Sequence, residues 1–173
     1  MKRLFLALLL LTSAALARPT HLLEGRLTLD LPEGFVQLSA EEIGRKFPPL
    51  RPPKVAFANN RKNMTVTVAV TISEATVKPG ELRAFGEYLK KVLSATGEVV
   101  AHGQIEIGGR SWYRILLQTE AVDQPVRNEI LVTPMGSQVM MLNLNSTLAD
   151  YPQYEKALQR TIESLVLSSE TSK

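Results

Sequence analysis

Hydrophobic and polar residues alternate with a period of two in several stretches of the chain, and each such stretch predicts a β-strand with one buried face. Residues 26–31, 54–59 and 64–73 follow this pattern in the first half. Neither face of 64–73 carries a charged side chain, which predicts a central strand covered on both sides. The turn chemistry of Pro32-Glu33-Gly34 ends the first strand.

Three other stretches indicate helices. Ser39 stands three residues before Glu42, the spacing of a capping box, and predicts a short helix over 40–46. An apolar stripe at helical spacing follows Pro79 and predicts a helix to about residue 96, where Gly97 ends it. A third helix is expected after Asp150, a candidate cap. The proline-rich residues 48–53 are expected to be an extended connection.

The second half of the chain reads as an antiparallel meander whose turns set the strand registers. Gly108-Gly109 predicts a two-residue hairpin, with Ile105 opposite Trp112. The turn at Asp123-Gln124-Pro125 is expected to pair Gln118 with Glu129 and Leu116 with Leu131. A three-residue loop at Gly136 then sets Leu131 against Met141 and Glu129 against Asn143. These registers give two largely apolar sheet faces, which the two longer helices are expected to cover.

One of the two predicted faces carries a polar cluster among apolar residues. The registers gather on it Trp112, Arg114, Glu129, Met141 and Asn143. A buried arginine needs a counter-ion, so Arg114 is expected to pair with Glu129. Tryptophan and methionine beside polar groups are suited to a protein or peptide partner, which makes this cluster a candidate binding face. The alternative is a structural ion pair at the margin of the sheet.

Composition narrows the chemistry. The chain has 173 residues, no cysteine, two histidines and a formal charge of +3, of which Lys2 and Arg3 contribute two units. The nearly neutral remainder argues against nucleic-acid binding. The absence of cysteine excludes thiolate chemistry and cysteine-ligated metals, and two histidines are too few for a histidine zinc site, so no metal or cofactor is expected. The chain contains no G-x-S-x-G, H-E-x-x-H or P-loop spacing.

The first 17 residues are expected to be a signal peptide. Lys2 and Arg3 precede an apolar run of about 14 residues, shorter than the ~20 that span a membrane, and Ala15 and Ala17 fit a signal-peptidase site. An uncleaved anchor is the alternative. Without cysteine there is no lipobox, so the mature protein is expected in the periplasm or the medium with no membrane anchor. Residues 18–25 are expected to be flexible, 26–167 to form one domain, and 168–173 to be a disordered tail.

The order of elements resembles that of the PsbP/DcrB-like family. The resemblance spans residues 26–167 and rests on 31–35 (Leu-Pro-Glu-Gly-Phe), the long strand 64–73, one amphipathic helix, the hairpin at 107–110, the meander and a helix ending near residues 162–165. It implies an α+β fold, an α/β/α sandwich around a mainly antiparallel sheet. It also implies a non-catalytic protein, since the family includes photosystem extrinsic subunits, bacterial envelope proteins, secretion chaperones and a binder of a small GTPase. The expected signal peptide favours the envelope type.

Two functional hypotheses follow. The first is an exported, non-enzymatic accessory or protein-binding module whose partner is another envelope or secreted protein. The second is a secreted hydrolase that uses an unrecognised carboxylate site, for which Glu41-Glu42 and Glu106 with Glu120 are the candidates. The missing motifs favour the first.

Overall fold

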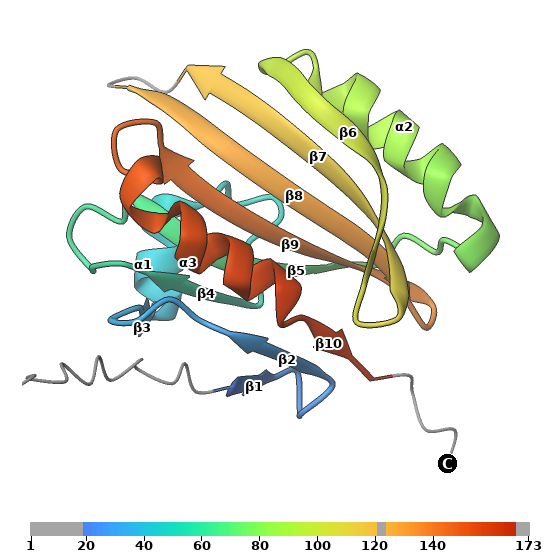
Figure 1. Cartoon of the computed structure of the whole chain (residues 1–173), viewed down its shortest axis with the longest axis horizontal. Coiled ribbons are helices and arrows are strands. Elements are labelled where there is room, and N and C mark those ends of the chain that lie inside the picture. The colour runs from blue at the N-terminus through green and yellow to red at the C-terminus, as the bar shows by residue number, and fades with distance from the viewer. Residues whose placement is uncertain (1–18, 121–123, 169–173) are drawn as a thin grey trace, which may run out of the picture.

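The computed structural model describes residues 19–120 and 124–168, so the expected signal peptide and residues 169–173 of the expected tail lie outside the described part. A seven-stranded antiparallel sheet has the order β3-β4-β5-β9-β8-β7-β6 (Figure 1). Its strands are β3 (Val36–Gln37), β4 (Val55–Ala58), β5 (Val66–Ser73), β6 (Glu98–Ile107), β7 (Arg110–Glu120), β8 (Pro125–Met135) and β9 (Gln138–Thr147). The uncharged strand β5 is internal, as expected.

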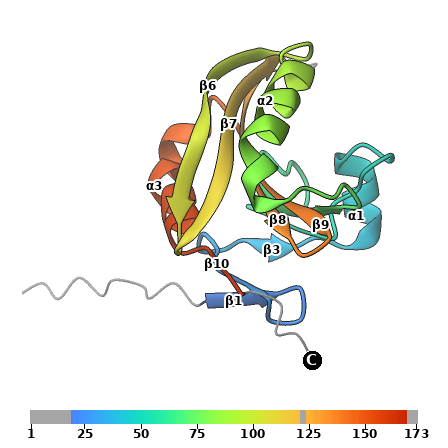
Figure 2. The same ribbon diagram turned by 90° about the vertical axis from the view of Figure 1, so that its right-hand side faces the viewer.

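Helices cover both faces of this sheet. Helix α3 (Tyr151–Glu163) lies on one face, and α1 (Ala40–Lys46) and α2 (Leu82–Leu93) lie on the other (Figure 2). Trp112 of the α3 face packs in one core with Leu158 and Ile162 of α3. Tyr113, the next residue, packs on the α2 face in a second core with Leu82. The α+β sandwich expected from the sequence is therefore the observed fold.

Side-chain hydrogen bonds mark the start of α1 and follow the end of α2, but not the start of α3. Helix α1 has the expected capping box: the Glu42 amide donates to the Ser39 hydroxyl at 3.2 Å, and the Ser39 amide donates to Glu42 Oε2 at 2.7 Å. Helix α2 ends at Leu93, earlier than expected, and the Thr96 hydroxyl donates to the Leu93 carbonyl. A 3₁₀ turn, η1 (Pro79–Glu81), precedes α2. Asp150 precedes α3 without a capping bond from its side chain.

The strand registers agree with the expectation at one turn and differ at two. Ile105 lies opposite Trp112, as expected from the Gly108-Gly109 hairpin. Between β7 and β8 the register is shifted by two residues, so Glu129 faces Leu116. Between β8 and β9 it is shifted by one, because Met135 pairs with Gln138 across a two-residue turn rather than a three-residue loop. A shift of two leaves every side chain on its expected face, whereas a shift of one moves each to the other.

A second, three-stranded sheet joins the two ends of the described chain. Its order is β1 (Pro19–Leu22), β2 (Leu27–Asp30), β10 (Val166–Leu167), and both pairings are antiparallel. Residues 18–25, expected to be flexible, thus contain a strand. The tip of the β6–β7 hairpin lies against the segment before β10, where a Cβ at Gly108 would come within 2.4 Å of the Leu165 carbonyl oxygen. No helix in the described residues is long and apolar enough to cross a membrane.

Candidate functional site

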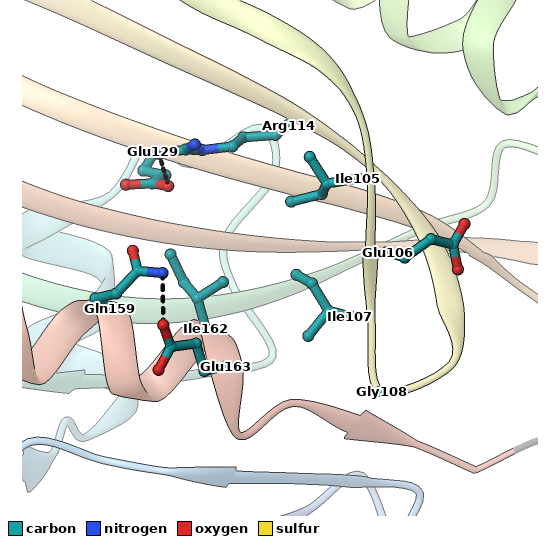
Figure 3. A pocket seen from close by; sticks show the side chains of 9 residues that line it. All are labelled: Ile105, Glu106, Ile107, Gly108, Arg114, Glu129, Gln159, Ile162 and Glu163. Atoms are coloured by element: carbon teal, nitrogen blue, oxygen red, sulfur yellow. Dashed lines mark hydrogen bonds and ion pairs between the residues drawn. The ribbon is translucent and has the colours of Figure 1, made fainter.

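A pocket of about 320 Å³ opens between α3 and the sheet, next to the β6–β7 hairpin (Figure 3). Ile105 and Ile107 point into it from β6, and Ile162 points toward them from α3. Arg114 of β7 and Glu129 of β8 form its polar wall; the remaining lining residues are Glu106, Gly108, Gln159 and Glu163. Glu106 turns away from the pocket and accepts a hydrogen bond from the Ser111 hydroxyl. The pocket therefore has an apolar side and a charged side.

The charged side centres on one buried carboxylate held by two arginines. Arg114 Nη2 lies 2.6 Å from Glu129 Oε1, and Arg127 Nη2 donates to Glu129 Oε2 at 3.0 Å. The register places Leu131 opposite Arg114, so Glu129 is the diagonal neighbour of Arg114 on the same face. Arg127 precedes Glu129 by two residues and shares that face. Two guanidinium groups on one carboxylate leave the cluster with a net positive charge.

Several polar atoms at this cluster are buried without a hydrogen-bond partner in the described residues. They are Trp112 Nε1, Arg114 Nε and Glu129 Oε1. The described residues contain five such side-chain atoms in all. Glu129 Oε1 is nevertheless ion-paired with Arg114 Nη2 at 2.6 Å, which leaves Trp112 Nε1 and Arg114 Nε as the two buried donors of this cluster without a partner in the described residues. Native proteins leave few buried polar atoms unpaired, so their concentration here marks this cluster as unusual.

The pocket continues into a wider hollow of about 750 Å³ along α3. Arg114, Gln159 and Glu163 line both volumes, and we call the continuous surface the α3 groove. The wider part is also lined by Arg127, Tyr151, Glu155, Lys156 and Arg160. The Arg127 guanidinium lies over the Tyr151 ring, 4.3 Å from its centroid, in cation–π geometry. Burial is the main cause that raises the pKa of Tyr151 above its usual value.

The structure brings together three of the five residues expected to form the binding face. Trp112, Arg114 and Glu129 share the α3 face, and Arg114 and Glu129 form the expected pair. Met141 and Asn143 lie on the α2 face instead, because the β8–β9 register differs by one residue. Met140, Leu142 and Leu144, which the predicted register placed on the opposite face, pack beside Trp112 in the core instead.

The sequence-based prediction missed Arg127 and the residues that α3 contributes to the groove. The period-two pattern of β8 would have identified Arg127, since it precedes Glu129 by two positions. The contribution of α3 depends on how that helix docks, which no local pattern indicates. Tyr151, Gln159 and Glu163 enter the groove only through that packing.

The carboxylates and histidines considered for catalysis lie apart from this groove or have structural partners. Glu42 caps α1 and pairs with Arg61 at 2.6 Å, and its pKa is lowered chiefly by the hydrogen bond from the Ser39 amide. Glu106 faces Ser111 near the hairpin tip, whereas Glu120 ends β7. The described residues contain no cluster of three or more potential metal-ligating His, Asp or Glu side chains.

A second polar network lies on the opposite face of the sheet, under α2. The Tyr113 hydroxyl donates to Glu87 Oε1 at 2.6 Å and lies 3.0 Å from His102 Nδ1, and Lys90 contacts Glu87 at 2.8 Å. Hydrogen bonds from Lys90 and then Tyr113 lower the pKa of Glu87 to about 2. Burial, followed by the bond to Glu87, raises the pKa of Tyr113 to about 12. This network accounts for His102 as a structural histidine.

No family model matches the sequence, and no curated protein matches it. Solved structures with the same fold include cyanobacterial PsbP (CyanoP) from Synechocystis sp. PCC 6803, with a TM-score of 0.61 and 14% identity over 90% of this chain and 96% of that one. LpqN, involved in cell envelope biogenesis of Mycobacterium tuberculosis, has a TM-score of 0.57 and 13% identity over 87% and 90% of the two chains. The Saccharomyces cerevisiae Ran-binding protein Mog1p has a TM-score of 0.53 and 14% identity over 88% and 95%.

Identities this low show a shared fold and no more. The expected resemblance to PsbP is confirmed at that level, and the chain has an α+β, PsbP-like fold.

Proposed function

We propose that this protein is an exported, non-enzymatic accessory module that binds another protein of the cell envelope through the α3 groove. The observation that carries the proposal is the Arg114–Glu129–Arg127 cluster at the junction of the groove's two parts. It supplies a partly exposed charge at Arg114 beside an apolar pocket, the combination of an anchoring pocket and a polar rim that protein-binding sites use.

Structural neighbours support binding in general. Mog1p is a Ran-binding protein, and LpqN is involved in cell envelope biogenesis; these are roles of those two proteins. The sequence supports the two finer parts of the proposal. The order of elements supports the DcrB-like envelope group, and the expected signal peptide at 1–17 supports export.

The groove is a poor place for carboxylate catalysis. A general base must reach the proton that it abstracts. Both oxygens of Glu129 are instead within 3.0 Å of an arginine nitrogen, and the side chain is 8% exposed. Reproducible ester, peptide or glycoside hydrolysis that disappears in Glu129→Gln would overturn the non-enzymatic part of the proposal.

Partner capture tests the binding role. Purified wild-type protein is used to capture proteins from an envelope fraction, alongside Arg114→Gln and the matched control Arg83→Gln, an exposed arginine on α2. We expect wild type and Arg83→Gln to capture a partner that Arg114→Gln does not capture, although Arg114→Gln is still folded. Equal capture by all three proteins, or capture by none, contradicts the assignment of the groove.

Intact-mass measurement tests export. We expect the mature protein, isolated from the periplasm or the medium, to begin at or near Arg18, after the Ala15-Leu16-Ala17 site. A retained Met1 in a membrane fraction would show that the segment is an anchor.

A further inference from the structure

We infer that the α3 groove takes an acidic segment of its protein partner, with a carboxylate on Arg114 and a large apolar side chain in the adjoining pocket. This inference rests on the proposed binding function and adds the chemistry of the partner. It depends on three observations: the charge left over in the groove, the apolar pocket beside it, and the position of Arg114 between them.

The groove has more positive charge than its own carboxylates neutralise. Its four cationic side chains, Arg114, Arg127, Lys156 and Arg160, stand against three carboxylates: Glu129, which Arg114 and Arg127 share, and Glu155 and Glu163 in the wider part, whereas Glu106 turns away. Within the described residues, Lys156 and Arg160 form no ion pair, and both are exposed. Glu163 accepts a hydrogen bond from Gln159 at 3.0 Å, a neutral partner. The surplus favours an anionic ligand.

Arg114 is the residue best placed to receive that anion. Its side chain is 35% exposed although one end contacts Glu129, which fixes the guanidinium at the groove wall. The opposite strand position on β6 is Gly103, where a Cβ would meet no atom within 4 Å, so the space beside Arg114 is open. A guanidinium already oriented by one carboxylate binds a second with little loss of side-chain freedom.

The apolar pocket defines the second half of the ligand. Ile105, Ile107 and Ile162 converge on it, and Arg114 stands at its margin (Figure 3). A ligand that fills both parts carries a carboxylate and a large apolar side chain a few ångströms apart, as neighbouring residues of a peptide do.

A protein segment fits this groove better than an anionic membrane surface does. A lipid surface is broad and is attracted by clustered cations without intervening carboxylates. Here Glu155 and Glu163 flank the two cations of α3, and the apolar side chains line a pocket rather than project from a face. Negative charges at such positions restrict which acidic segments fit, which is how charged interfaces obtain specificity.

The test is selection from a phage-displayed library of random heptapeptides on wild type, Arg114→Gln, Arg160→Gln and Arg83→Gln. On wild type and Arg83→Gln we expect enrichment of Asp or Glu within two positions of a large apolar residue. Substituting Gln for the acidic residue in the best synthetic peptide should weaken binding about tenfold, the factor expected for one charge-assisted hydrogen bond. Arg114→Gln should cause a similar loss and should make binding insensitive to that peptide change.

Arg160→Gln guards against misfolding of Arg114→Gln. Arg160 is exposed on α3, and its substitution should weaken the binding of the acidic peptide without lowering the melting temperature of the protein. The inference is wrong if no peptide is enriched, if enriched peptides lack acidic residues, or if Arg114→Gln selects the same ones. It is also wrong if phosphatidylglycerol vesicles bind through Arg114 and acidic peptides do not. Arg114-dependent partner capture without an acidic preference in the library would reject this inference and leave the proposed function standing.

Discussion

Trp112 and Tyr113 are neighbours on β7 and both are about 1% exposed, yet their polar atoms meet opposite conditions on the two faces of the sheet. On the α2 face, the Tyr113 hydroxyl is bonded to Glu87 and lies within hydrogen-bond distance of His102. On the α3 face, the indole Nε1 of Trp112 has no hydrogen-bond partner in the described residues. Arg114 Nε, two residues on, shares this condition.

This difference distinguishes a structural network from a binding site. A satisfied buried network contributes to stability, whereas a buried donor without a partner costs about 1 to 3 kcal/mol. The α2 side is also packed tightly, since a Cβ at Gly86 would lie 2.1 Å from the Tyr113 ring. The α3 side instead keeps the α3 groove and, at Trp112 and Arg114, buried donors without a partner in the described residues, whereas the unpartnered atoms of the α2 side, Thr67 Oγ1 and Asn143 Oδ1, lie outside the Tyr113 network. We interpret the α2 face as a fixed support and the α3 face as the side that retains capacity to bind.

Truncation of the tryptophan should produce the largest effect. Trp112→Ala removes a buried aromatic side chain from the core beneath α3 and should lower the free energy of unfolding by about 3 to 5 kcal/mol. Trp112→Phe keeps an aromatic ring in the core and removes the N–H group without a partner together with part of the indole volume, so it should cost less than Trp112→Ala. Denaturant titration measures both. A loss below about 1 kcal/mol for Trp112→Ala would mean that the residue is not a core residue.

Neutralising Glu129 should have the next largest effect, because it leaves two arginines facing each other over a mostly buried position. We expect Glu129→Gln to cost about 2 to 3 kcal/mol, less than for a fully buried pair because Arg114 is 35% exposed. Arg114→Gln should cost about 1 kcal/mol, since Arg127 still contacts Glu129.

The double variant Arg114→Gln/Glu129→Gln provides the control for that prediction. Its loss in denaturant titration should be smaller than the sum of the two single losses, because the substitutions remove interacting charges together. Strict additivity would show that the 2.6 Å contact contributes no coupling.

Residues whose structure is set by near neighbours were predictable from sequence. Ser39 and Glu42 cap α1 through contacts three residues apart, and α1 has its expected bounds. Gly108-Gly109 gave the register of β6 and β7, because both glycines have a positive φ and close a two-residue turn. Trp112, Arg114 and Glu129 remain on one face despite an error at the next turn, since a shift of two residues preserves the faces.

The remaining errors come from turns and docking that local sequence leaves open. Gly136 fits a two-residue turn and a three-residue loop equally well, and the choice moves Met141 and Asn143 across the sheet. The strand β1 is short, contains no fully buried residue, and forms by pairing with β2. The share of α3 in the groove follows from the packing of Leu158 and Ile162 on the sheet core, a tertiary contact.

Removing the tyrosine hydroxyl tests the α2 side of the comparison. Tyr113→Phe should cost about 1 to 2 kcal/mol, because the hydroxyl's bonds to Glu87 and His102 are lost while the ring packing stays. Tyr88→Phe is the matched control: Tyr88 lies on α2 and is 62% exposed, so its hydroxyl should contribute almost nothing. Equal losses of unfolding free energy in denaturant titration for the two variants would show that the Tyr113 network does not stabilise the fold.

The smallest expected effect is on acid stability and comes from Glu87. Its pKa is lowered to about 2 in the folded protein by hydrogen bonds from Lys90 and Tyr113, from an ordinary value of 4.5. A carboxylate with a depressed pKa stabilises the fold above its ordinary pKa, and the contribution disappears as the pH falls toward the folded value. Glu87→Gln should therefore lose less stability than wild type between about pH 4.5 and pH 2. The exposed Glu120→Gln is the control, and thermal melting across that range is the measurement. If the melting temperatures of wild type and Glu87→Gln fell equally with pH, the hydrogen bonds of Glu87 to Lys90 and Tyr113 would contribute nothing to stability.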